Sequence, residues 1–320
     1  MEKTIVIHNK GIQNSMKNYH DGKCGSRMLF GIAELQKAFG AEVYNLNSIK
    51  QTTWNILTKR CDIVFVQDFL PKFYLPFFLL KLLTLGRKKF LILMHAHPYG
   101  KGKVLSEVKW YKKFLLNIWC KGIDKALFFD PVLLEETVGS GALSLEHCQM
   151  VHWGEDLDYI KQLPPPVPGD YWVSSGKERR DFKLVNELKE LLSEDKFKYI
   201  GPEYSHEECQ ILTLKSKGVI VTPKEDGLTY CCGITNILEA IALGKPVICV
   251  RNTHYPFDVE KEGFGFYVDL HDTKRIIELM NLIDNDDDLY QSLSRNAYRI
   301  SKQFNMQIFR RELKEIIEML

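Results

Sequence analysis

The sequence predicts an α/β protein with two domains, each a parallel sheet with helices packed on it. Short apolar runs, such as residues 219–221 and 247–250, are bounded by Gly or Pro and indicate buried parallel strands. Between these runs, apolar residues recur from Ile234 with the period of an amphipathic helix that ends at Gly244. Four prolines within residues 164–168 predict an extended linker, so a domain boundary is expected near residue 165.

Composition narrows the classes of function. The net charge of +2 hides an asymmetry: residues 1–150 carry 21 Lys and Arg against 12 Asp and Glu, and the remainder carries 22 against 29. An acidic second half disfavours a nucleic-acid partner, whereas the basic first half suits anionic lipid or a phosphorylated acceptor. No secretory leader is recognised, and the apolar run 73–83 is shorter than the roughly 20 residues of a bilayer span, so a cytoplasmic protein is expected.

The first half alternates strands with loops and helices. Strands are expected over residues 4–8, 43–46 and 61–67, and a helix over residues 26–39. Gly22 and Gly25 fall in the loop between the first strand and that helix. Their GxxG spacing differs from the GxGxxG dinucleotide fingerprint, which disfavours a nicotinamide enzyme and leaves a ligand loop or a flexible surface loop as the interpretations.

Two apolar and basic segments follow. Residues 79–85 predict a helix buried against the sheet, while the aromatic residues just before them, flanked by cations, are a candidate for contact with a membrane surface. Residues 103–122 predict an amphipathic helix with many lysines. Its expected apolar stripe is Val104, Val108, Tyr111, Leu115, Ile118 and Trp119. A solvated lysine face is the alternative to membrane docking.

Two histidines follow the strand predicted over residues 90–94. His95 and His97 are two residues apart, so both rings leave the same face if the strand continues, at the sheet edge where open α/β proteins bind ligands. No third ligand has suitable spacing, and the eight cysteines show no CxxC or Cys/His pattern, so no metal site is expected.

The second half opens with a strand and a basic loop. Ser175 and Gly176 end the strand, and Lys177 and Arg180 lie in the loop, where they form either an anion site or a solvated turn. Gly201 follows the next strand. Further on, Asp284-x-Asp286 has the form of a metal-binding DxD motif, but it lies between two helices, where acidic residues stabilise a helix start.

The stretch from Gly233 to Glu239 combines an anion site with a carboxylate. A helix N-terminus presents unpaired N–H groups and partial positive charge, so the amides around Gly233, Ile234 and Thr235 are suited to a phosphate. Glu239 shares a face with Thr235 about 6 Å further along the helix, a separation that suits the ribose hydroxyls of a nucleotide.

The stretch GITNILEAIALGKPVI resembles the donor-site helix of GT-B glycosyltransferases, especially the retaining group numbered family four, the glycosyl transferases group 1. The resemblance implies two Rossmann-like domains facing across a cleft. Residues 1–164 would bind the acceptor, residues 165–304 would bind the nucleotide sugar, and helix 305–320 would pack back on the first domain. The enzyme would transfer a sugar, with retention, from a nucleoside-diphosphate sugar, expected to be UDP-linked, to a glycan or lipid-linked acceptor in polysaccharide biosynthesis.

The resemblance also implies roles for individual residues. Arg180 and Lys177 would neutralise the leaving diphosphate, and His97 first, or His95 second, would contact the donor sugar. Neither a cofactor nor a metal ion is implied beyond the donor itself. The implied donor-binding residues are Gly22, Gly25, Ser175, Gly176, Gly201, Gly233, Ile234, Thr235 and Glu239.

One position departs from the family pattern. A second Glu is usual eight residues before the Glu-Ala pair, and Cys231 stands there instead, with Glu225 and Asp226 further upstream. Two alternatives therefore stay open beside the transferase, namely a non-hydrolysing UDP-sugar 2-epimerase and a non-catalytic GT-B-like subunit or binding module. The basic first half adds the hypothesis of peripheral contact with the inner face of an anionic membrane.

Overall fold

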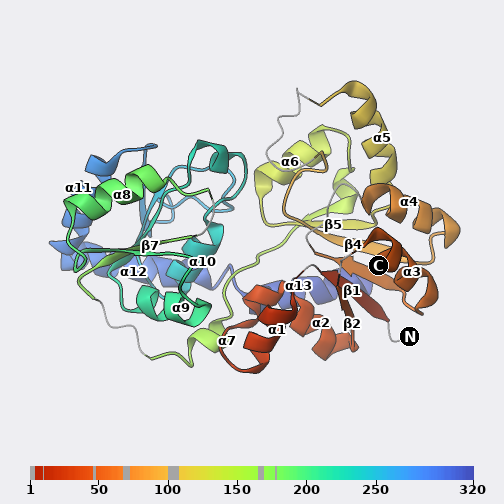
Figure 1. The fold of residues 1–320 in the computed structure, drawn as a ribbon, viewed down its shortest axis with the longest axis horizontal. Coiled ribbons are helices and arrows are strands. Elements are labelled where there is room, and N and C mark those ends of the chain that lie inside the picture. The colour runs from red at the N-terminus through yellow and green to blue at the C-terminus, as the bar shows by residue number, and fades with distance from the viewer. Residues whose placement is uncertain are drawn as a thin grey trace. The chain divides into compact units, whose positions relative to one another are not determined.

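The computed structural model describes residues 4–9, 11–45, 48–67, 73–99, 108–164, 169–176 and 179–320. The chain divides into two compact units (Figure 1). The first contains Met1–Asp21, Ser26–Trp153 and Ile308–Leu320, and the second contains Gly22–Gly25 and Gly154–Gln307. Each unit has its own parallel sheet with surrounding helices, which confirms the predicted α/β class.

The first unit is built on a six-stranded parallel sheet. Its order is β2 (Glu42–Asn45), β1 (Ile5–Asn9), β3 (Ile63–Val66), β4 (Lys89–Met94), β5 (Lys125–Phe128) and β6 (Cys148–Met150). Every residue of β1 and β3 is buried, as expected for strands covered by helices on both faces, although β1 ends in the polar residues His8 and Asn9. The helices of this unit are α1 (Gln13–His20), η1 (Ser26–Leu29), α2 (Ile32–Phe39), α3 (Ile49–Thr58), α4 (Tyr74–Leu83), α5 (Trp110–Cys120), α6 (Pro131–Gly139) and η4 (Leu145–His147).

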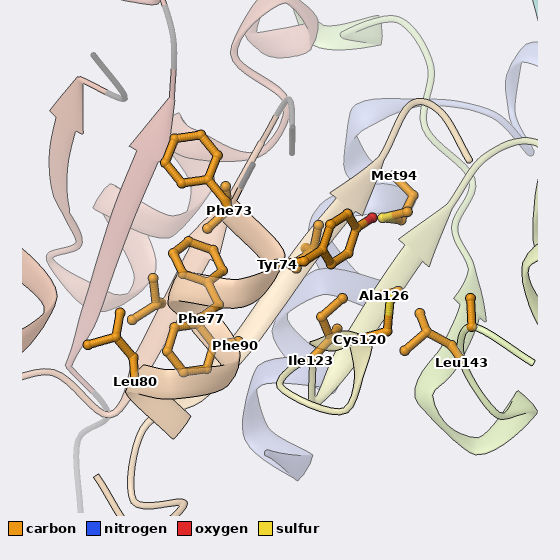
Figure 2. Packing of buried hydrophobic residues seen from close by; sticks show 14 of the residues in the cluster. Phe73, Tyr74, Phe77, Leu80, Phe90, Met94, Cys120, Ile123, Ala126 and Leu143 are labelled. Carbon is orange, nitrogen blue, oxygen red and sulfur yellow. The ribbon is translucent and has the colours of Figure 1, made fainter. Parts of the chain in front are cut away.

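In helix α4 the end predicted to be exposed is buried, and most of the end predicted to be buried is exposed. Its aromatic front end is in the core: Phe73, Tyr74 and Phe77 are each at most 2% exposed and pack with Phe90 of β4 (Figure 2). Most of the part predicted to be buried is exposed: Leu79 has 47% and Leu83 has 71% of its surface in solvent, and only Leu80, at 1%, is in the core. The earlier residues form the core because they fill the space between α4 and the sheet, and the apolar helix has more leucines than that space accepts.

Two other expectations about the first unit are corrected. The helix expected over residues 26–39 is interrupted, because Phe30 (φ 47°) and Gly31 (φ 90°) separate η1 from α2. Helix α1 was not predicted, since it has no buried residue and therefore no apolar period. In α5, Tyr111 and Leu115 of the expected apolar stripe are exposed, while the residues 101–107 lie outside the described ones.

The last helix, α13 (Met306–Met319), packs mainly with the first unit. A Cβ at Gly31 would lie 2.7 Å from the Leu313 side chain, so this glycine allows the close approach of α13. The Glu312 carboxylate accepts hydrogen bonds from the His152 backbone N–H at 2.8 Å and interacts with His152 Nδ1 at 2.6 Å. Arg310 pairs with the buried Glu34 of α2 at 3.4 Å. The helix is therefore attached by both packing and charge.

The second unit has a five-stranded parallel sheet. Its order is β11 (Gly265–Val268), β10 (Val247–Val250), β9 (Gly218–Val221), β7 (Trp172–Ser175) and β8 (Phe197–Ile200). From β7 the chain continues to β8 on one side of it, and the next strand, β9, lies on the other side of β7. The strand order therefore reverses at β7. Open α/β sheets bind ligands at the carboxyl ends of strands at such a reversal. The helices are α7 (Leu157–Ile160), α8 (Phe182–Leu191), α9 (His206–Leu214), η5 (Glu225–Thr229), α10 (Ile234–Ala242), α11 (Thr273–Asp284) and α12 (Asp287–Ser301).

The chain changes units at Trp153 and Gly154, whereas the prolines predict a boundary near residue 165. Residues 165–168 of the predicted linker lie outside the described ones. A Cβ at Gly154 would lie 1.9 Å from the Phe304 carbonyl oxygen, and Glu155 pairs with Asn305 in a parallel bridge. Residues 154–164 are thus held within the second unit by backbone contacts that composition does not reveal.

A buried histidine in the first unit is expected to lower its stability in acid. His8 on β1 is fully buried, and neither ring nitrogen has a hydrogen-bond partner among the described residues. Burial lowers the pKa of His8 from 6.5 to about 4, so the neutral ring stabilises the fold fully above pH 6.5 and this contribution is lost as the pH falls toward 4. We expect His8→Met to remove up to about 3 kcal/mol of this loss. Urea unfolding at pH 6.5 and at pH 4 measures the loss in the free energy of unfolding. The exposed His20→Gln is the control, and an equally reduced pH dependence in this variant would contradict the assignment to His8.

No helix in the described part of the chain is both long and apolar enough to cross a bilayer.

Candidate functional site

Arg180 is the central residue of the predicted anion site in the second unit. It follows β7 and is only 6% exposed. Its Nε donates to the Ser175 carbonyl at 2.9 Å, one terminal nitrogen donates to Cys232 Sγ at 3.0 Å, and the other donates to Asn236 Oδ1 at 2.8 Å. These three partners are neutral, and Arg180 forms no ion pair with a described carboxylate. A buried cation without a counterion is costly, so this arrangement favours an anion beside Arg180.

Gly176 provides the space that Arg180 occupies. Its φ is +135°, a conformation that L side chains rarely adopt, and an added Cβ would lie 2.4 Å from Arg180 Nε. Ser175, the preceding residue, bonds through its hydroxyl to the Asn236 side-chain amide. Residues 175 and 176 therefore connect the end of β7 with Arg180 and with the first turn of α10.

The N-terminus of α10 lies beside this cluster, and Gly233 makes its position possible. Gly233 has φ +92°, and a Cβ there would lie 2.4 Å from Val221 at the end of β9. The Ile234 N–H donates to the Cys231 carbonyl at 3.1 Å, and the Asn236 N–H donates to the Gly233 carbonyl at 3.0 Å. Thr235 is exposed, whereas Ile234 is 5% exposed. The exposed Thr235 thus marks the solvent side of this helix start.

The loop before α10 is fixed from behind. The Tyr255 hydroxyl donates to the Cys232 carbonyl at 2.7 Å, and the Asn252 side chain donates to the Tyr230 carbonyl at 2.9 Å. Cys231, the residue at the departing family position, is 8% exposed. The two carboxylates upstream do not replace the missing acid beside Arg180. Asp226 pairs with Arg179 at 3.7 Å, and Glu225 is exposed on η5.

Glu239 lies one turn further along α10 and is 8% exposed. Burial raises the pKa of Tyr159, and the charge of Glu239 is one of several that add to this shift, so the two side chains lie within electrostatic reach. The Tyr159 hydroxyl donates to the Lys23 carbonyl at 3.0 Å, and a Cβ at Gly25 would lie 2.7 Å from Asp156. The structure thus brings the glycine loop that contains Gly22 and Gly25 to the same unit as Glu239.

His95 and His97 have different surroundings in the first unit. Strand β4 ends at Met94, so the alternation expected to place both rings on one face stops before them. His95 contacts the rings of Phe30 and Phe129, each at 5.2 Å between centroids. His97 is 8% exposed, and its Nδ1 accepts the Tyr99 N–H at 3.2 Å. Burial lowers the pKa of His97, partly opposed by the Glu136 backbone, which favours a neutral ring.

Of the remaining predicted residues, one lies outside the described chain and one lies near Gly176, while the two acids of the DxD pattern have structural roles. Lys177 lies outside the described residues. Gly201 follows β8, and it is close to Gly176 because Ile200 pairs with Ser175. Asp284 accepts a hydrogen bond from Trp172 Nε1 at 3.1 Å, and Asp286 caps α12 by accepting the Leu289 N–H at 2.9 Å. Both members of the DxD pattern therefore have structural partners.

Three residues of this region escape sequence reasoning. Asn236 bridges Arg180 and Ser175, Cys232 accepts from Arg180, and Tyr159 connects the Gly22–Gly25 loop with the surroundings of Glu239. The one available signal is Asn236 itself, which, with Thr235 and Glu239, is one of three polar residues in a largely apolar helix. Cys232 and Tyr159 carry no pattern that separates them from ordinary core residues.

Comparisons with known proteins agree with the geometry. Residues 169–300 match the family described as Glycosyl transferases group 1. Anabaena HepE, solved with UDP and glucose, has a TM-score of 0.65 and 10% identity, and the match covers 99% of this chain and 100% of that one. A glycosyltransferase from Rickettsia africae has a TM-score of 0.63 and 16% identity, with 98% and 97% covered. WaaG, a glycosyltransferase involved in lipopolysaccharide biosynthesis, has a TM-score of 0.62 and 10% identity, with 98% and 99% covered.

No curated protein sequence matches the chain. The fold similarity extends over nearly the whole length, whereas the family match covers the unit that contains Arg180, Gly233 and Glu239. The chain therefore has the GT-B fold, and over residues 169–300 it matches the glycosyl transferases group 1.

Proposed function

We propose that this protein is a glycosyltransferase that takes a sugar from a nucleoside-diphosphate sugar, with UDP as the nucleotide. The family match and the fold support a transferase. The observation that carries the proposal is the buried Arg180 with only neutral partners beside the start of α10. A diphosphate would supply the negative charge that Arg180 lacks among its partners, and the N-terminus of α10 also favours negative charge.

The same arrangement suits the chemistry of sugar transfer. As the glycosidic bond breaks, negative charge grows on the diphosphate, and fixed positive charge at that point lowers the barrier. Arg180 is held by three hydrogen bonds, so it does not need to reorganise during the reaction. We propose that this charge, with Lys177 as a second cation, makes a metal ion unnecessary. His97 first, and His95 second, stay our candidates for contact with the donor sugar.

The choice of UDP is supported by a structural relative. HepE was solved with UDP and glucose, with UDP alone and with UDP-glucose. We further propose a retaining mechanism and a glycan or lipid-linked acceptor, as in polysaccharide biosynthesis at the cytoplasmic side of a membrane. A mixture of the protein with UDP-sugars tests the class: transfer or hydrolysis supports it, epimerised sugar would indicate a 2-epimerase, and UDP binding without turnover would indicate a non-catalytic module.

Glu239 provides a direct test of nucleotide orientation. If its carboxylate accepts the ribose hydroxyls, Glu239→Gln should weaken UDP binding about 10- to 100-fold, the range for hydrogen bonds to a charged group. The wild type should lose a similar amount when UDP is replaced by 2′-deoxy-UDP, while the variant should discriminate little between the two. Calorimetric titration measures all four combinations, with the exposed Glu278→Gln as a control. Equal discrimination by the variant and the wild type would rule out this role.

A further inference from the structure

The outer surface of three neighbouring helices in the first unit is apolar and basic. Helix α4 packs against both α3 and α5, and all three contribute to one core cluster on the same side of the sheet. Figure 1 shows these helices following one another along one side of this unit. Their outward residues define what we call the apolar-basic face: Trp54 on α3, Leu82, Leu83 and Leu85 on and after α4, and Trp110 and Phe114 on α5.

The apolar side chains on this face are unusually exposed. Leu85 is 82% exposed, Trp110 is 79% and Phe114 is 61%. More than half of the exposed large apolar side chains in the described part of the chain lie on or beside these three helices. Next to Trp54, residues of α3 line a hollow of about 520 Å³. A concentration of exposed apolar side chains on neighbouring helices favours a site of interaction.

The core does not explain these side chains. Figure 2 shows Phe73, Tyr74, Phe77 and Leu80 directed into the cluster beneath the helix. The leucines that follow at Leu82, Leu83 and Leu85 are therefore additional to what the core holds. A helix that is apolar on all sides is normally buried on all sides. The outer side of α4 is therefore expected to contact an apolar partner or phase.

The charges on this face have one sign. None of the residues in Ile49–Thr58, Tyr74–Leu83 and Trp110–Cys120 is Asp or Glu. Lys50, Arg87, Lys109, Lys112 and Lys121 are exposed, and none of them forms an ion pair with a described residue. By contrast, Lys81 and Lys89 are neutralised by Asp124. The three helices and the residues that flank them therefore carry both exposed apolar groups and cations without ion-pair partners among the described residues.

We propose that the apolar-basic face is a docking surface for anionic lipid. Apolar groups among cations match a bilayer interface, where leucine and aromatic side chains enter the acyl boundary and lysines contact anionic headgroups. A second copy of the chain fits less well, because a two-fold contact would place the lysines of both copies together. The proposal deepens the proposed membrane contact and rests on the proposed function only for the lipid-linked acceptor that such docking would serve.

The test is flotation of the full chain with lipid vesicles. We expect binding to vesicles with roughly one-third phosphatidylglycerol at about 0.1 M salt, weaker binding to neutral vesicles, and release as salt shortens the screening length. The double variant Trp110→Ser, Phe114→Ser should lower partitioning at least about tenfold. The triple variant Lys109→Gln, Lys112→Gln, Lys121→Gln should lose the preference for anionic vesicles.

Matched controls distinguish docking through this face from nonspecific adsorption of exposed apolar side chains. Leu145 and Leu191 are both 65% exposed and lie off this face, so Leu145→Ser and Leu191→Ser should float like the wild type. Thermal melting checks that each variant is folded, as expected for replaced side chains that point into solvent. A wild type that does not float at low salt, or a Trp110 and Phe114 variant that floats equally well, would overturn the proposal. So would a dimer that this variant converts to monomers.

UDP titration keeps the two proposals apart. The Trp110 and Phe114 variant should bind UDP like the wild type, because these residues lie in the first unit, whereas Arg180 and the start of α10 lie in the second. If UDP binding fails while flotation persists, the donor assignment falls and the lipid surface stands. If flotation fails while UDP binding persists, only the lipid surface falls.

Discussion

Replacing Arg180 with alanine is expected to lower kcat/KM for sugar transfer or donor hydrolysis by about 10³, equivalent to about 4 kcal/mol of transition-state stabilisation. The loss should be this large because the guanidinium is buried, has neutral partners only and is held in place by three hydrogen bonds. A charge fixed in such a site acts on the growing charge of the leaving group without first reorganising.

Arg179 is the matched control. Its guanidinium contacts the Asp226 backbone carbonyl at 3.2 Å and lies over the Tyr230 ring at 5.1 Å, so it is already engaged away from Arg180. Arg179→Ala should reduce kcat/KM less than tenfold. Arg180→Lys should restore little, because lysine cannot form the same three bonds. Comparable losses in the two alanine variants, with both folded by circular dichroism, would show that Arg180 has no special role.

Gly176→Ala is expected to reduce kcat/KM by about 10², without removing any functional group. The new methyl would lie 2.4 Å from Arg180 Nε, and φ at this position is +135°, so either the guanidinium or the loop must move. A displacement of about 1 Å at a charge that stabilises a transition state is enough for a loss of this size.

A double-mutant cycle distinguishes this effect from general damage. If Gly176 acts by positioning Arg180, the loss in the double variant should be close to that of Arg180→Ala alone, which is strongly non-additive. UDP affinity and kcat should both be measured, together with melting temperature. Gly139→Ala is a control, because a Cβ there meets nothing within 4 Å. Simple additivity of the two losses would place the effect of Gly176 elsewhere.

The elements with strong local signals were predictable. The strands at 219–221 and 247–250, and the helix between them, are recognised because buried parallel strands are continuously apolar and α10 has an apolar period. Gly233 was expected to open this helix, and its left-handed φ explains why glycine stands there. Helix α1 had no such signal, because it buries none of its residues and depends on its neighbours for stability.

Side-chain direction was less predictable than element type. In α4 nearly every residue is apolar, so no period distinguishes the side facing the sheet, and the prediction exposed Phe73 and buried Leu79 when the reverse holds. The same limit applied to His95 and His97. Their expected common face depended on the strand continuing past Met94, where it ends.

The α/β class and the likeness of GITNILEAIALGKPVI to a donor-site helix follow from the order of residues alone, because both depend on residue type at short spacing. The groups that surround Arg180 become known only from the folded chain, since Ser175 at the end of β7 and the segment from Cys232 to Asn236 at the start of α10 are far apart in the sequence. The folded chain also decides which side of α4 faces outward. Both outcomes depend on the volume left between packed elements, which local sequence does not encode.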